Sequence, residues 1–174
     1  MNNDKINLLD LNNFNLFIDD KEKNSVFTVA TVCTNCFKNL FKILKDVFIN
    51  VTLKINSDGI SIYKCEWSKT SKVKKNEISS LFYLTGIIGY TGEHNPLILS
   101  NKCEKYVCNV DTIFIKILTS DLEIINKHIT NDSVLYFFIN KDNYNSETNQ
   151  ASSIQFYVYD SDISISDIII DCVK

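Results

Sequence analysis

Two pairs of cysteines lie close enough in the sequence to suggest metal or redox chemistry. Cys33 and Cys36 have the C-x-x-C spacing of half a zinc site or of a redox pair, whereas Cys103 and Cys108, with four residues between them, are poorly spaced for either. The sequence has no second C-x-x-C pair that could complete a zinc site with the first. We therefore interpret these thiols as structural or incidental, and we expect neither a metal nor a cofactor.

The histidines and acidic residues offer little more for catalysis. His94 falls in an expected Gly/Pro-flanked loop and His128 at an expected helix end, and no serine or cysteine nucleophile stands in a recognisable elbow near either. The sequence has no Gly-rich phosphate loop. We expect a protein that is not an enzyme, and a hydrolase using cysteine or histidine is the weakest of the alternatives. Alternating acidic residues near the C-terminus could imitate a metal site but fit a charged outer strand face better, namely Asp160, Asp162, Asp167 and Asp171.

A line of lysines is the strongest functional pattern. Lys38, Lys42 and Lys45 fall at i, i+4 and i+7, so a helix would present their ammonium groups on one side. All 18 basic residues are lysines, which contact phosphate as point charges rather than in bidentate geometry. The line is therefore either the solvated face of an amphipathic helix or a non-specific, salt-sensitive contact with nucleic-acid phosphates.

The segment that carries these lysines is predicted to form a helix that packs on a β-hairpin. Val51, Leu53 and Ile55 then alternate as in a strand, and residues 57–59 form a turn before Ile60 and Ile62. The apolar positions of the helix recur every three or four residues and are Phe37, Leu40, Phe41, Leu44, Val47 and Phe48.

A second helix is expected from about Phe114 to residues 131–132. Its other face carries Lys116, Ser120, Glu123 and Lys127. Its apolar positions are Phe114, Ile117, Leu118, Leu122, Ile125 and Ile129.

The remaining pattern is mostly of strands. Thr34 or Asn35 could cap the first helix, and residues 67–76 form a lysine-containing loop. Further strands are expected at residues 25–32, 78–88, 97–99, 106–109, 133–140, 153–159 and 163–173. The order is β-α-β-β-β, repeated, which predicts an α+β domain with two helices packed on one face of antiparallel sheets. Residues 1–24 form an N-terminal extension and residues 25–174 a single domain.

Composition narrows the class of protein. The 174 residues are 45% hydrophobic and 22% charged, with a net charge of −3, as in an ordinary soluble globular domain. No apolar run approaches the length of a membrane span, and the N-terminus lacks the order of a signal peptide. Together with six cysteines that we expect to be reduced thiols, this predicts an intracellular protein with no membrane partner.

Several of these segments resemble the proliferating cell nuclear antigen family of DNA sliding clamps. The helix at residues 37–46 and the hairpin at 57–62 are similar to the opening of a clamp domain. Residues 103–108, 117–127 and 131–135 follow the family's tyrosine-containing strand, second inner helix and acidic-turn strand, and residues 164–171 are similar to the last strand of the clamp's first domain. The resemblance spans residues 25–174 and rests on order and spacing.

The resemblance implies a ring with helices on its inner wall and sheets outside, which encircles duplex DNA and tethers a polymerase. It places Lys38 and Lys45 at or near DNA-contacting positions, with Lys42 extending the line and Lys116 and Lys127 as further DNA-binding candidates. Expected partners are duplex DNA, a DNA polymerase or other replication proteins, and another copy or another clamp subunit. The expected location is the nucleus or another site of DNA replication, including a viral replication compartment.

Three features depart from the family's pattern. Glu123 stands where a basic residue would be expected, and residues 65–76 rewrite part of the front pocket that accepts partner peptides. The chain also matches only one of the two domains of a clamp subunit, so a ring of this chain alone would need about six copies by the family's symmetry. Glu123, the altered pocket segment and the negative net charge favour an alternative: a clamp-fold regulatory or protein-interaction factor, in transcription or checkpoint control, that does not itself encircle DNA.

Overall fold

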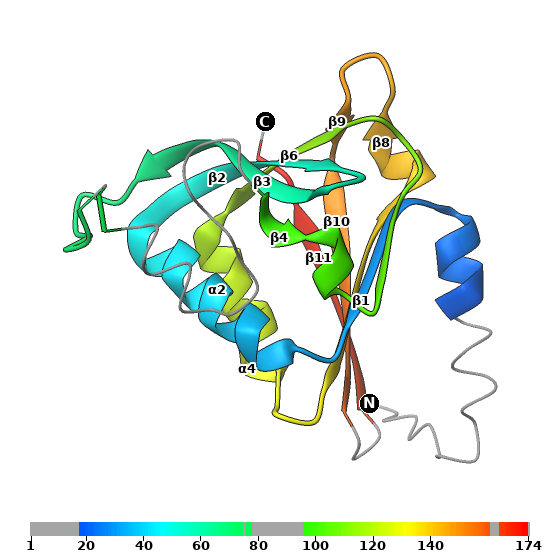
Figure 1. The fold of residues 1–174 in the computed structure, drawn as a ribbon, viewed down its shortest axis with the longest axis horizontal. Coiled ribbons are helices and arrows are strands. Elements are labelled where there is room, and N and C mark those ends of the chain that lie inside the picture. The colour runs from blue at the N-terminus through cyan, green and yellow to red at the C-terminus, as the bar shows by residue number, and fades with distance from the viewer. Residues whose placement is uncertain (1–17, 75, 78–95, 161–163, 174) are drawn as a thin grey trace.

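The computed structural model describes residues 18–74, 76–77, 96–160 and 164–173, which fold into two sheets and two main helices (Figure 1). The helices are α2 (Thr34–Val47) and α4 (Leu122–His128). The strands are β1 (Ser25–Thr31), β2 (Phe48–Asn56), β3 (Gly59–Trp67), β4 (Pro96–Leu99), β5 (Lys105–Cys108), β6 (Ile113–Leu118), β7 (Val134–Asn140), β8 (Tyr144–Asn145), β9 (Gln150–Ala151), β10 (Ser153–Asp160) and β11 (Ser164–Asp171). Short 3-10 turns lie at Ser100–Lys102, Thr119–Asp121 and Lys141–Asn143.

The two halves of the chain exchange their first strands. Within the described residues, the five-stranded sheet has the order β11-β10-β7-β1-β5, and the six-stranded sheet has the order β4-β3-β2-β6-β9-β8. Strand β1 of the first half therefore joins the strands of the second, while β6 of the second half pairs with β2 of the first. The pairings are antiparallel except for β6 with β9. The predicted α+β class and the repeated β-α-β-β-β order are confirmed, and the exchange binds both halves into one core.

Helix α2 forms as its apolar period predicts. Its apolar face is buried. The backbone becomes extended at Phe48, where a run rich in β-branched residues begins β2. The predicted cap is wrong: the helix starts at Thr34 itself, after Cys33 as a cap without a side-chain hydrogen bond. The Thr34 hydroxyl donates instead to the carbonyl of Thr130, at 3.2 Å, and so ties the start of α2 to the turn after α4.

The second helix is shorter than predicted because its first residues form a strand. Ile113, Ile115 and Ile117 alternate inward in β6, and all three are buried. The apolar residues of this stretch fit both the period of a strand and that of a helix, since Phe114, Ile117 and Leu118 also fit a helical face. The alternating isoleucines decide for the strand because their β-branched side chains suit a pleated, half-buried surface between β2 and β9.

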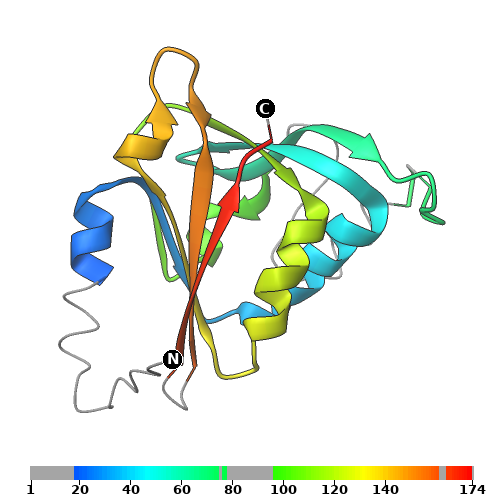
Figure 2. The ribbon, with the colours of Figure 1, turned by 180° about the vertical axis from the view of Figure 1, so that it is seen from behind.

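The helices lie in the angle between the two sheets (Figures 1 and 2). One core cluster joins side chains from α2, α4 and both sheets, including Phe37, Leu40, Ile115, Leu122 and Phe137. Both helices therefore cover the inner faces of the sheets, as predicted, and leave the outer faces of the sheets to other segments or to solvent.

Residues 18–23 are helical and pack on the outer face of the five-stranded sheet, on the side away from α2 and α4 (Figures 1 and 2). Ile18 is buried there against Phe138 and Tyr157. Glu22 forms an ion pair with Lys105 of β5. The end of the predicted N-terminal extension thus has a defined place on the sheet.

Some predicted features fall outside the described residues, namely the strand at 78–88, His94 and Asp162. Residues 141–150, between β7 and β10, contain the 3-10 turn Lys141–Asn143, strand β8 and the first residue of β9. Within the described ranges, no helix is both long enough and apolar enough to cross a bilayer.

Candidate nucleic-acid interface

Helices α2 and α4 lie side by side, and polar contacts fix their spacing. The Asn126 amide of α4 donates to the carbonyl of Lys38 in α2, at 3.2 Å. In return the Lys38 ammonium donates to the carbonyl of Ile129, at 3.2 Å, where α4 ends. A cation at a helix C-terminus also complements the helix dipole. The two contacts link α2 directly to α4.

Four of the five predicted DNA-binding lysines come together on this surface, which we call the helix face. Lys38, Lys42 and Lys127 are exposed, and the side chain of Lys45 is 38% exposed. Between the helices is a hollow of about 270 Å³, and its lining residues are Lys42, Lys45, Asp46, Glu123, Asn126 and Lys127. The helix face therefore has a modest excess of positive charge around a groove.

Glu123 reduces that excess by pairing across the helices. Its carboxylate lies 2.6 Å from the ammonium of Lys45, and both side chains are substantially exposed, at 48% and 38%. The hydrogen bond and charge of Lys45, with a smaller contribution from Lys127, lower the pKa of Glu123. Lys42, by contrast, has no hydrogen bond or ion pair to another described residue. Lys42 and Lys127 are thus better placed than Lys45 to meet an external phosphate.

Lys116 does not belong to the helix face. It was predicted on a helix, but it lies in β6, opposite Thr52 of β2. Its neighbours Ile115 and Ile117 point into the core, so Lys116 points to the outer side of the six-stranded sheet. The predicted helical position of Lys116 is wrong because the helical period was applied to a strand.

Cys36, Cys103 and His128 lack the features expected of catalytic residues. Burial raises the pKa of Cys103 to about 11, and burial together with Cys33 raises the pKa of Cys36 to about 11, so neither thiol is an activated thiolate at neutral pH. His128 Nδ1 lies 3.0 Å from the Ser166 hydroxyl, on an exposed part of edge strand β11 rather than in a nucleophile elbow. In the part of the chain that the structure describes, no three or more histidine, cysteine or acidic side chains are grouped to hold a metal ion.

Sequence reasoning missed the part played by Asn126. An asparagine in the middle of a helix carries no interface signal of its own, and its contact with Lys38 depends on how α2 and α4 meet. Glu123 was recognised as a departure, but its pairing with Lys45 needed the same packing geometry.

Comparison with solved structures identifies the architecture. Over 86% of this chain and 48% of the other, the structure is similar to proliferating cellular nuclear antigen from Entamoeba histolytica, with a TM-score of 0.57 and 15% identity. Over 84% of this chain and 46% of the other, it is similar to a chain of the PCNA2–PCNA3 complex from Sulfolobus tokodaii, with a TM-score of 0.53 and 16% identity. This chain has a sliding-clamp fold.

The sliding-clamp fold is supported by structure rather than by sequence. No family model matches the sequence, and no curated protein matches it. The chain spans about half the length of the clamp structures it matches. The resemblance first drawn from residue order and spacing is therefore confirmed at the level of the fold.

Proposed function

We propose that this chain is a non-enzymatic sliding-clamp domain that contributes to encircling duplex DNA and thereby to DNA polymerase processivity in replication or repair. The observation that carries the proposal is the helix face: α2 and α4 present Lys38, Lys42, Lys45 and Lys127 on the side away from the core. Ammonium groups facing a phosphate cylinder attract it without fixing a register, which suits sliding. The protein would act where DNA is replicated, in the nucleus or in a viral replication compartment.

Strand β11 supports the assembly of a ring. It lies at the end of the five-stranded sheet with β10 as its only strand neighbour among the described residues, so its outer backbone groups are available to another strand. Ile169 is 62% exposed there, which adds an apolar contact. The partner at this edge would be another copy of the chain or another clamp subunit.

A charge-removal experiment tests the DNA contact. The double variant Lys42→Gln and Lys127→Gln should weaken binding to a labelled 30-base-pair duplex and lower the slope of log K against log salt by about 2, because each lost phosphate contact contributes about 0.9. The matched control is Lys69→Gln with Lys72→Gln, two exposed lysines of the loop after β3. Equal binding by wild type and the helix-face variant would refute the proposed contact.

The alternative of a clamp-fold regulatory factor is favoured by the Lys45–Glu123 pair, which offsets charge on the helix face. Such a protein would bind its partner without enclosing DNA. The two functions differ in topology, because only an enclosing ring is held on a closed circle of DNA and lost from its open ends.

A further inference from the structure

The outer side of the six-stranded sheet carries a second basic surface, separate from the helix face. On β2, the alternation that buries Val51 and Ile55 directs Thr52 and Lys54 outward. Thr52 is in register with Lys64 of β3 on one side and with Lys116 of β6 on the other. Neighbouring strands are about 4.8 Å apart, so the two flanking lysines are about 10 Å apart across the sheet.

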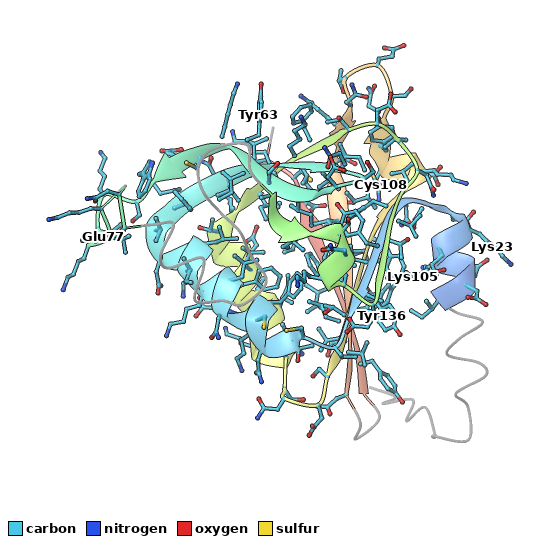
Figure 3. All side chains as sticks on the ribbon, in the orientation of Figure 1. Lys23, Tyr63, Glu77, Lys105, Cys108 and Tyr136 are labelled. Atoms are coloured by element: carbon cyan, nitrogen blue, oxygen red, sulfur yellow. The ribbon has the colours of Figure 1, made fainter. Side chains whose placement is uncertain are left out.

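Two aromatic rings accompany these lysines. The register of β3 against β2 shifts between Thr52 and Leu53, which makes Tyr63 the extra residue of a bulge. Tyr63 is 37% exposed, and Figure 3 shows it on the side of the sheet away from the helices. Its ring centre lies 4.9 Å from that of Phe114, and the Lys64 ammonium lies 5.3 Å from the Tyr63 ring centre. Aromatic and cationic groups are therefore presented together.

A concavity of about 600 Å³ is lined by Tyr63, Lys64, Phe114 and Lys116, while Lys54 lies outside its lining. Its far wall comes from the β8–β9 hairpin, where Thr148 and Gln150 supply hydroxyl and amide groups. One carboxylate also lines it, that of Glu66, which accepts a hydrogen bond from Asn50 at 2.6 Å. The surface thus combines cations, rings and neutral hydrogen-bonding groups around a single partnered acid.

We propose that this outer surface binds single-stranded nucleic acid. Phosphates would be attracted by Lys54, Lys64 and Lys116, and an unpaired base would stack on the Tyr63–Phe114 pair. A duplex offers no free base for such stacking, because its bases are stacked on one another. An acidic peptide would use the lysines but would gain nothing particular from the rings. The chemistry therefore favours a single strand over either of these ligands.

The test measures binding of a labelled 12-nucleotide thymidine oligomer by fluorescence anisotropy between 50 and 200 mM salt. Replacing Tyr63 with alanine should weaken binding about 5- to 150-fold, the range for loss of one stacked base, whereas Tyr63→Phe should bind like the wild type. Tyr63→Leu retains side-chain bulk without the aromatic ring and should be as weak as the alanine variant. Lys64→Gln with Lys116→Gln should lower the salt slope by about 1.4, because each single-strand phosphate contact contributes about 0.7.

Matched variants separate this site from the helix face. Lys69→Gln with Lys72→Gln removes the same charge from the loop after β3 and should leave oligomer binding unchanged. The helix-face variant Lys42→Gln with Lys127→Gln should also leave it unchanged while weakening duplex binding. The proposal is overturned if wild type fails to bind the oligomer at 50 mM salt, or if folded Tyr63→Leu binds like wild type. It is also overturned if an oligoglutamate peptide binds with the same dependence on Tyr63.

Discussion

Replacing Glu123 with glutamine should strengthen duplex DNA binding. In the native protein the Glu123 carboxylate lies 2.6 Å from the Lys45 ammonium, so this ammonium is already paired within the protein. Because Lys45 lowers the pKa of Glu123, the carboxylate is fully charged at neutral pH, and the substitution removes a whole negative charge. It also frees Lys45 to meet a phosphate. The helix face therefore loses a repulsive group and gains an available cation.

The size of the effect follows from the geometry. Two unit charges a few ångströms apart in water interact strongly enough to change an equilibrium about fivefold, so affinity at 50 mM salt should rise by about that factor. One additional phosphate contact should make the salt slope steeper by about 0.9. Both quantities come from anisotropy titrations of a labelled 30-base-pair duplex between 50 and 200 mM salt.

A matched control removes the same charge elsewhere. Glu147 lies on the β8–β9 connection, away from the helix face. The variant Glu147→Gln should therefore change duplex affinity little. The reasoning is refuted if Glu123→Gln leaves both affinity and salt slope at the wild-type values. It is also refuted if Glu147→Gln raises affinity as much, since net charge rather than the Lys45 pair would then explain the gain.

Two further predictions concern stability. Leu40→Ala should lower the free energy of unfolding by about 2–5 kcal/mol, because Leu40 is 1% exposed in the core shared by both sheets, and urea unfolding that moved by much less would contradict the packing described. Burial raises the pKa of Cys103 from its ordinary value of 9.0 to about 11, so the unfolded state loses this proton first and stability should fall as pH rises from 9 towards 11. Cys103→Ala should make the decline in melting temperature over that range shallower, and an unchanged decline would mean that this thiol does not contribute to it.

The sequence predicted those elements whose hydrophobic period has one interpretation. In α2 the apolar residues fit a helix and no strand, and in β2 the alternation of Val51, Leu53 and Ile55 fits a strand and no helix. In β6 the isoleucines and Phe114 fit both periods, so a strand was predicted as a helix and Lys116 was assigned to the wrong surface. The local sequence pattern does not determine the secondary structure of such a stretch. Pairing with the two neighbouring strands determines it.

Contacts between separate helices and strands could not be predicted from the sequence, for a different reason. The Lys45–Glu123 pair joins residues of separate helices, and it depends on the side-by-side packing of α2 and α4. The outer surface of the six-stranded sheet was missed because the bulge at Tyr63 breaks the alternation of β3, so Tyr63 and Lys64 are both exposed although they are adjacent. Its lysines come from three strands that only the sheet brings together.

Retention on circular DNA tests encirclement most directly. The protein would be incubated with a nicked circular plasmid, and the complex would be passed through a gel-filtration column at 200 mM salt before and after the plasmid is cut once. The proposed clamp should travel with the circle and be released when the DNA is linearised, because sliding off an end needs no broken contact. Equal retention before and after cutting, or no retention on the circle, would contradict encirclement by this chain.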